Sequence, residues 1–390
     1  MSKKFFIQNS NVCTRMELHG ENVKEVLKQN GWEMVDNRED ADYIFFNTCA
    51  FIKNVEEETI KRLSEIKEKD KLVIIGCLPE INREELNKLM PFKSYGGYDL
   101  NPILKDFGLT DTPRLVGGRL SEETGFSNSL INKANVVLRN SYLTYLYDKK
   151  KVYHLWISQG CLGNCTYCAD PANKTKLRSH LVADIIENFK DALNKGYKIF
   201  SLNADDTSSF GYDNNENLTM LLEQIISVEG DYKIIITECN PVIFSKQPQF
   251  KEVLKSSKIT LINLPLQSGS KEIINSMGRK YEPEKIVKIL EEIKKENSKL
   301  MVNTHVIVGF PGECNEDFIQ TKKILENFIF NRIKVFKYSE RPNTKAILLP
   351  NKVDEDVKLD RYKILKRLVL RQTIKSVSLQ KYIVNFTRPT

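Results

Sequence analysis

The stretch that decides the fold runs from residue 153 to residue 168 and reads YHLWISQGCLGNCTYC. Its first five residues are apolar and brief, which predicts a buried strand. A loop with two glycines follows and carries Cys161, Cys165 and Cys168, in the spacing C-x3-C-x2-C. Three thiols are therefore expected directly beyond the end of a strand.

Three thiolates within eight residues suit an iron–sulfur cluster. They can bind three irons of a [4Fe–4S] cube and leave the fourth iron open to a small molecule. A zinc site is the alternative, but zinc normally takes a fourth Cys or His nearby. No such residue follows until His180. The spacing therefore favours the cluster.

Downstream of the cysteines, predicted strands alternate with predicted helices. The further strand candidates are Lys198–Leu202, Lys233–Ile236, Ile259–Leu264, Met301–Val308 and Ile333–Tyr338. Helical patterns such as Leu181–Leu193 and Pro283–Glu296 separate them. Six strands with intervening helices predict a (βα)6 partial TIM barrel over residues 149–350. Residues 351–390 are expected to form a helical tail, with Leu359, Tyr362, Leu365 and Leu368 on one side.

Residues 1–110 predict a separate α/β domain with a parallel sheet, joined to the barrel by a linker over residues 111–148. Strands are expected at Lys4–Gln8, Tyr43–Phe46 and Leu72–Ile75, with a helix at Val55–Ile66. A cysteine follows each strand, and these are Cys13, Cys49 and Cys77. Because ligands sit beyond the carboxyl ends of parallel strands, the three thiols can converge. Taken alone, however, they read more simply as buried packing residues.

Composition and charge set the broad class. The chain has 390 residues, 41% hydrophobic and 28% charged, which suits two or three ordinary globular domains. No long apolar run or secretory leader is visible, so a cytoplasmic protein is expected, in which eight cysteines indicate metal or catalysis rather than disulfides. The net charge is +8, and residues 351–390 carry ten Lys/Arg against four Asp/Glu. This basic tail fits nucleic acid, an acidic polypeptide or simply a solvated helix face.

The cysteine loop strongly resembles that of the radical S-adenosylmethionine (SAM) superfamily. The resemblance implies that the open iron chelates the amino and carboxylate groups of SAM and that Tyr167 lies beside the adenine. It also implies that the segment Val306–Glu313, with Val308 and Gly309, contacts SAM. An ordinary buried strand ending in a Pro-Gly turn describes that segment equally well.

Most of the chain resembles the radical SAM methylthiotransferases, and the aspartate-modifying branch that acts on a ribosomal protein is nearest. The resemblance rests on Cys13 with Glu21, Asn47–Ile52, Gly76–Pro79, Gln159–Cys161, Arg178–Ser179, Asp206–Asp213, Pro265–Ser270, Met277–Tyr281 and Tyr338–Thr344. It implies that Cys13, Cys49 and Cys77 hold a second [4Fe–4S] cluster with one open iron. Gln267 and Ser268 belong to the matched segments and are expected to take part in cofactor binding.

Several positions depart from the family pattern. Met16 and His19 replace a usual Asn and Asp, and Asn263 and His305 replace a customary His and Asp. Family members usually end in a small β-barrel, the TRAM domain, and this sequence stops about where that barrel would begin. The cluster ligands are kept while pocket residues have changed, so the departures put the usual substrates in question more than the chemistry.

Other candidate residues stand outside the two triads. Asp205 and Asp206 follow a strand candidate and are expected to bind the SAM amine or the substrate. Cys239 and Cys314 are interpreted as packing or incidental residues, and His305 as a core histidine. The chain is expected to act as a monomer without a membrane, with flavodoxin or ferredoxin as electron donor.

The resemblance implies that reductive cleavage of SAM yields a 5′-deoxyadenosyl radical, that this radical removes hydrogen from an unactivated carbon, and that sulfur on the second cluster is then transferred. Three hypotheses follow for the function. The first is methylthiotransfer to a peptide or protein, such as a ribosomally synthesised precursor peptide. The second is methylthiotransfer to tRNA adenosine, and the third is an iron–sulfur protein without turnover, which the intact cysteine motif disfavours.

Overall fold

The structure is a computed structural model. It describes residues 2–10, 13–50, 52–89, 92–97, 99–110, 117–118, 152–170 and 176–386, with side chains up to residue 372. Apart from residues 117–118, the expected linker over 111–148 lies outside the described residues. Within the described part, no helix has the length and apolar character needed to cross a membrane.

The N-terminal domain is a five-stranded parallel sheet in the order β2-β1-β3-β4-β5. Its strands are β1 (Lys4–Asn9), β2 (Glu33–Met34), β3 (Tyr43–Thr48), β4 (Leu72–Gly76) and β5 (Lys93–Gly96). Its helices are α1 (Thr14–Gln29), α2 (Lys53–Glu65), α3 (Leu78–Ile81), α4 (Arg83–Leu89) and α5 (Asn101–Phe107), with 3-10 turns η1 (Arg38–Asp40) and η2 (Lys69–Lys71). This strand order is one of the two common doubly wound arrangements, in which ligands bind at the carboxyl edge.

The sheet carries a hydrophobic core on each face. Phe45 packs with residues of α1 and α5 on one face, and Phe46 packs with residues of α2 to α4 on the other. A parallel strand buried on both faces reads as a continuous apolar run, which is why three strands were visible in the sequence. Those three predicted strands are confirmed, and the predicted helix at Val55–Ile66 is α2.

The barrel domain contains six parallel strands in chain order, with β6 (Gly117–Gly118) added antiparallel to β7 at the edge. The six are β7 (Val152–Trp156), β10 (Ile199–Asn203), β11 (Lys233–Ile236), β12 (Ile259–Asn263), β13 (Met301–Val308) and β14 (Arg332–Lys337). The expected (βα)6 partial barrel is confirmed. A two-stranded ribbon, β8 (Ser158–Gln159) with β9 (Arg178–Ser179), flanks the cysteine loop.

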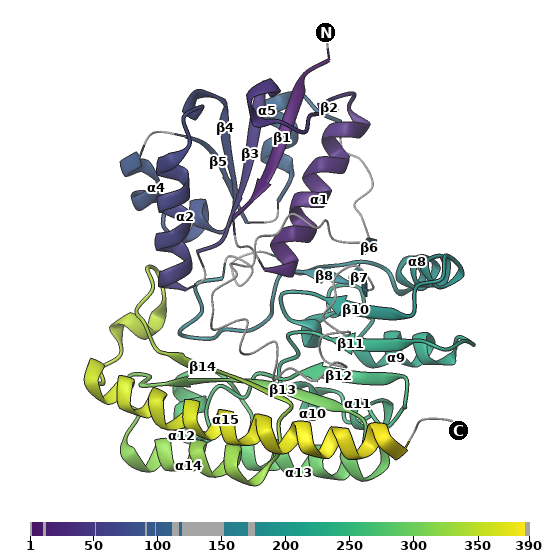
Figure 1. Ribbon diagram of the computed structural model, residues 1–390, viewed down its shortest axis with the longest axis vertical. Coiled ribbons are helices and arrows are strands. Elements are labelled where there is room, and N and C mark those ends of the chain that lie inside the picture. Colours follow the sequence, from purple (N-terminus) through teal and green to yellow (C-terminus); the bar gives the residue numbers. More distant parts are fainter. Residues whose placement is uncertain are drawn as a thin grey trace.

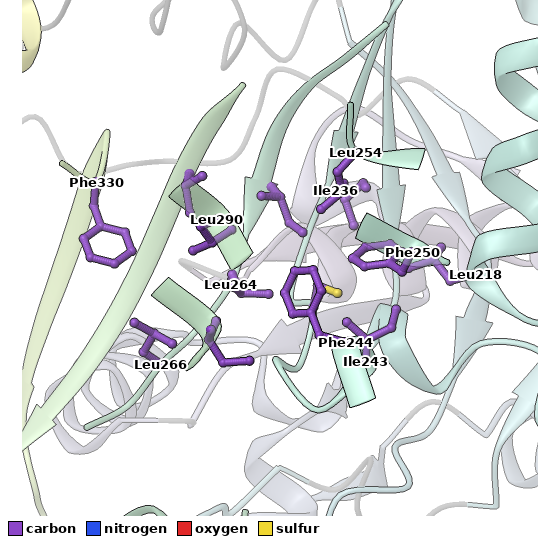
Figure 2. Close-up of a cluster of buried hydrophobic side chains, with 14 of the residues drawn as sticks. Leu218, Ile236, Ile243, Phe244, Phe250, Leu254, Leu264, Leu266, Leu290 and Phe330 are labelled. Carbon is purple, nitrogen blue, oxygen red and sulfur yellow. The ribbon is translucent and has the colours of Figure 1, made fainter. Parts of the chain in front are cut away.

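Helices cover one face of the barrel sheet (Figure 1). They are α8 (Val182–Asn194), α9 (Leu218–Ser227), α10 (Ile243–Lys246), α11 (Phe250–Val253), α12 (Lys271–Ser276), α13 (Pro283–Glu296), α14 (Asn315–Asn327) and α15 (Glu355–Phe386), with 3-10 turns η4 (Thr207–Ser209) and η5 (Lys345–Leu348). The core between sheet and helices is apolar, and Figure 2 shows part of it, including Ile236, Phe244, Phe250, Leu264 and Leu290.

Helix α15 is the last helix of the barrel and packs against β14 and α14 (Figure 1). Leu365 and Leu368 are buried in the barrel core, and Tyr362 packs against it. Leu359 is exposed, although the sequence pattern put it on the same side. At its start, α15 also holds the turn after β13, because Arg361 donates to the Glu313 carboxylate at 2.6 Å and Glu313 accepts from the Gly309 N–H at 2.6 Å.

Candidate functional site

The loop with Cys161, Cys165 and Cys168 is fixed by backbone hydrogen bonds from two other segments. The Thr166 N–H donates to the Met277 carbonyl at 3.0 Å, and the Thr166 carbonyl accepts from the Ala346 N–H at 2.8 Å. Gly278 has a positive φ of 75°, and a Cβ there would lie 2.5 Å from the Asn164 carbonyl oxygen. The loop therefore has a fixed position on the barrel.

The three thiols of this loop point toward one another. The Gly163 N–H donates to Cys161 Sγ at 3.1 Å, and a Cβ at Gly163 would lie 3.1 Å from that sulfur and 3.7 Å from Cys165 Sγ. Glycine at this position lets the chain wrap closely around both thiols. Cys168 completes the group, because its pKa responds to the charges of Cys165 and Cys161.

Burial favours the protonated thiols of Cys161 and Cys168 in the absence of metal. It raises the pKa of Cys161 to about 12, with the neighbouring Asp206 adding to the effect, and it raises the pKa of Cys168 well above its usual value. Thiolate ligands must lose their protons to bind metal, and the positive charge of iron supplies the compensation that burial removes. Metal binding at this loop should therefore release protons.

Cys13, Cys49 and Cys77 also converge, although 64 residues separate the first from the last. They follow β1, β3 and β4, which are neighbours in the sheet, so all three lie at its carboxyl edge. The pKa of Cys77 is raised first by burial and then by the charges of Asp170, Cys49 and Cys13. Cys49 and Cys77 are buried, whereas Cys13 is exposed. The three cysteines that the family resemblance assigns to a second cluster thus lie at one edge of the sheet.

An ion-pair network lies between the two triads, and two of its members, Arg15 and Asp170, carried no signal in the sequence. Arg15, two residues after Cys13, pairs with Asp170 at 3.0 Å and with Asp205. Asp170 is two residues beyond Cys168, and its charge also raises the pKa of Cys77. In addition, Cys161 packs against the same hydrophobic core as Cys49 and Cys77. The two triads therefore face each other across the domain interface.

Asp205 and Asp206 have partners other than those expected from the sequence. The second oxygen of Asp205 accepts from the Gly160 N–H at 2.7 Å, so both oxygens have protein donors. Asp206 accepts from the backbone and hydroxyl of Ser208 and lies 3.8 Å from Cys161 Sγ. Both carboxylates therefore contact the cysteine loop or the residues beside it.

Tyr167 belongs to the cysteine loop, and its ring is turned toward the turn after β13. Its ring packs edge-on against Phe310 with centroids 6.4 Å apart, and its hydroxyl accepts from Arg279 Nη1 at 3.0 Å. Gln267 has a positive φ of 66° and forms an isolated bridge to Val306, which carries its backbone to the same edge of the sheet. The structure thus brings the matched segments together around one end of the barrel.

Ser268, Val308 and Gly309, the other residues expected to contact SAM, present no side chain to the inner face of the barrel. Ser268 is buried and its hydroxyl lies 3.2 Å from the Thr321 hydroxyl on α14, and Val308 belongs to the helix-side core. Gly309 has a positive φ of 72°, and a Cβ there would collide with Lys358 of α15. At these three positions only the backbone is placed to meet a ligand on the inner face of the barrel.

A second tie between the domains starts at Arg341, beyond β14. Its guanidinium is buried, pairs with Glu56 of α2 and donates to the Ala50 carbonyl at 2.6 Å. Ala50 follows Cys49, so this barrel residue holds one of the thiol-bearing loops of the other domain. The sequence contained the motif around Arg341 but no signal for its partner.

The six thiols fit clusters better than a single ion. Among the described side chains no three His, Cys, Asp or Glu groups are close enough to hold one metal ion. Thiolates on one zinc stand about 3.8 Å apart, given Zn–S bonds of about 2.3 Å, whereas thiolates on separate corners of an iron cube stand farther apart.

Comparisons with known proteins decide the family. Residues 157–325 match the radical SAM superfamily, and residues 6–95 match a family described as uncharacterized protein family UPF0004. The ribosomal protein uS12 methylthiotransferase RimO of Clostridium tetani is 31% identical over 380 residues, with 95% of this chain and 82% of that protein covered. The chain belongs to the radical SAM methylthiotransferase family. A probable threonylcarbamoyladenosine tRNA methylthiotransferase of Pyrococcus horikoshii is 30% identical, with 88% of this chain and 78% of the relative covered.

Solved structures support the fold of this methylthiotransferase. The radical SAM methyltransferase TsrM of Kitasatospora setae, solved with tryptophan and a SAM analogue, aligns with a TM-score of 0.62 at 13% identity, covering 88% of this chain and 75% of TsrM. The cobalamin-dependent radical SAM enzyme OxsB aligns with a TM-score of 0.55 at 13% identity, covering 95% of this chain and 56% of OxsB. At these identities the likeness concerns the fold alone. The chain is an enzyme of the radical SAM methylthiotransferase class, whose cofactors are SAM and [4Fe–4S] clusters.

Proposed function

We propose that this enzyme inserts sulfur, as a methylthio group, at an unactivated C–H bond of a peptide or protein. The observation that carries the proposal is the meeting of two thiol triads at one interface. Asp170 acts on the pKa values of both Cys77 and Cys168, which belong to different domains. Reacting groups must be held close together for such a transfer, because effective molarity collapses when they are misplaced.

The roles of the thiols follow from their positions. Cys161, Cys165 and Cys168 would hold the cluster that binds SAM, and Cys13, Cys49 and Cys77 would hold the auxiliary cluster. When bound, the clusters and SAM supply the radical chemistry and the sulfur, neither of which a protein side chain provides. The chain itself positions these groups, and the Arg15 and Arg341 ion pairs hold the two cysteine-bearing regions together.

SAM would lie between the cysteine loop and the ends of β12 and β13. Tyr167 and Gln267 are placed there, with the backbone of Ser268, Val308 and Gly309 forming the rim. Asp205 and Asp206 would act indirectly, by fixing the loop before and around Cys161.

A peptide or protein is the favoured substrate class, and a ribosomally synthesised precursor peptide is the specific form we propose. Support comes from the relative that modifies ribosomal protein uS12 and from the Asp206-Thr207 segment. Methylthiotransfer to tRNA is the second candidate, favoured by the Pyrococcus relative and the net charge of +8. RNA binding would weaken steeply with salt. Flavodoxin or ferredoxin would deliver electrons to a monomeric enzyme.

Anaerobic reconstitution of three proteins tests the assignment. The wild type should bind about eight irons, and Cys49→Ala and Cys161→Ala about four each, since each variant loses one cube. With SAM and dithionite, Cys49→Ala should still form 5′-deoxyadenosine, whereas Cys161→Ala should form none. A wild type with about four irons, or mass spectrometry showing sulfur insertion by Cys49→Ala, would contradict the proposal.

A further inference from the structure

The inner face of the barrel sheet, turned away from the covering helices, carries a group of polar residues near its open edge strand β14. On β14, Ile333 and Val335 belong to the helix-side core, so the alternate residue Lys334 faces inward. On β13, Val306 and Val308 belong to the same core, which turns His305 inward.

His305 and Lys334 are direct partners in the register of these two strands. Side chains directly opposite each other on one face are neighbours, so the imidazole and the ammonium lie together. The His305 ring packs edge-on against Phe336, the next inward residue of β14, with centroids 5.8 Å apart. Desolvation lowers the pKa of His305 to about 4, so its ring is neutral near pH 7 and offers a hydrogen bond rather than a charge.

Lys334 is exposed to solvent between two buried neighbours. Burial by surrounding protein nevertheless lowers its pKa, and Arg332 lowers it further. Among the described residues no carboxylate oxygen lies within 4.0 Å of its ammonium group. An ammonium group with no close carboxylate can pair with an anionic ligand through a charge-assisted hydrogen bond.

One carboxylate, Glu238, faces the same group from the end of β11. Its charge acts on both His305 and Lys334, and its Oε1 accepts from Asn263 Nδ2 at 2.8 Å. Glu238 also has a positive φ of 40°, which is strained for a residue with a side chain. The inner face therefore presents a hydrogen-bond acceptor beside its cation.

The group lies toward the N-terminal triad. The charge of Cys13 acts on Lys334, and the Cys13 thiol is exposed. A ligand anchored at Lys334 would therefore sit close to the auxiliary triad, where the proposed function needs the substrate. The inference rests on that function and specifies its substrate.

We propose that Lys334 and His305 bind a carboxylate of the peptide substrate, while Glu238 accepts a hydrogen bond from a nearby peptide N–H. The substrate class is thus a peptide with an Asp, a Glu or its own C-terminal carboxylate next to the modified position. Glu238 suits a peptide backbone, which offers an N–H donor at almost every residue.

Equilibrium binding to the reconstituted enzyme tests this site. The probe is a fluorescein-labelled, alanine-rich peptide with a central Asp, compared with its Asn counterpart by fluorescence anisotropy. The wild type should bind the Asp peptide about tenfold more tightly, which is the size of one charge-assisted hydrogen bond. Lys334→Met should abolish the preference and Lys334→Arg should keep it.

Lys337→Met is the matched control, because Lys337 lies on the same strand and pairs with Glu355 at 3.5 Å. An amidated Asp peptide and a free-acid Asn peptide separate the side-chain carboxylate from the terminal one.

Equal affinity for the Asp and Asn peptides in the wild type would overturn the proposal, as would a preference that survives Lys334→Met. Tighter binding of an RNA hairpin than of either peptide, lost in Lys334→Met, would overturn it in favour of a phosphate site. Loss of iron in both Lys334→Met and Lys334→Gln would assign Lys334 to the cluster instead. A wild type that forms 5′-deoxyadenosine but shows no preference contradicts this site alone, whereas a wild type that forms none contradicts the proposed function.

Discussion

Arg15→Met is the substitution that most directly probes how the two domains hold their triads together. Arg15 is the cation shared by Asp170 and Asp205, and the side chains of the three are 18%, 10% and 3% exposed. Methionine keeps most of the length of the side chain and removes its charge. The substitution would remove the cation that these two buried carboxylates share.

The expected cost follows from that burial. Removing one partner of a buried ion pair costs about 3–5 kcal/mol, because the remaining charge stays desolvated and unpaired. This cost weakens the contact between the two domains. It lowers the ratio of molecules with both triads correctly placed to those with the domains apart by at least about a hundredfold. Neutralising the carboxylates as well, with Asp170→Asn and Asp205→Asn, should recover much of it, since no unpaired charge remains.

Two measurements on the reconstituted proteins check this reasoning. Urea denaturation reports stability, and electron paramagnetic resonance of the dithionite-reduced protein reports the magnetic coupling between the clusters. Arg15→Met should keep about eight irons yet show weaker coupling and lower stability, and Arg15→Lys should be intermediate. If Arg15→Met matched the wild type in both measurements, or if the triple neutral variant were less stable than Arg15→Met, the role given to this network would be wrong.

Three other substitutions have distinct expected outcomes. Arg341→Met leaves the Glu56 carboxylate buried and unpaired, so iron analysis should show loss of the auxiliary cluster and urea denaturation a cost of about 3–5 kcal/mol; an unchanged iron content would contradict this. The folded-state pKa of His305, about 4, lies below its unfolded value of about 6.5, so the unfolded chain binds a proton at a higher pH than the folded chain does. The free energy of unfolding should therefore fall by roughly 2 kcal/mol from pH 7 to pH 5. His305→Gln should lessen that fall, as measured by urea midpoints at the two pH values. Gly278→Ala places a Cβ 2.5 Å from a backbone oxygen of the cysteine loop and should lower iron binding at that loop, whereas Gly196→Ala, whose Cβ meets nothing within 4 Å, should cost only about 1 kcal/mol of backbone strain.

Strands were predictable from the sequence where they contain a run of mostly apolar residues. The strand Met301–Val308 was predicted to the residue, because it is apolar along most of its length and ends at a glycine turn. Strand β2 has only two residues and β5 reads Lys-Ser-Tyr-Gly, so neither presents an apolar run. These edge strands form because a neighbouring strand offers hydrogen-bonding groups, which is information that local sequence lacks.

The candidate site divides in the same way. Cys161, Cys165 and Cys168 were recognisable because their spacing is local. Arg15 pairs with residues 155 and 190 positions away, so no window of sequence contains the network. Asp205 shows the consequence, because its place after a strand gave no sign that the fold would pair it with Arg15 and the Gly160 N–H.

The residues that join the two domains are different from the residues that line the inner face of the barrel sheet. Buried ion pairs from Arg15 and Arg341 join the cysteine-bearing loops of the two domains, and a change in either would move one triad relative to the other. Asn263 and His305, which replace residues usual in the family, lie instead on the inner face, where Asn263 donates to Glu238 and His305 is opposite Lys334. Under the carboxylate site proposed above, substitution on this face would alter the charge and hydrogen bonding that the substrate meets, whereas substitution of Arg15 or Arg341 would alter the contact between the domains.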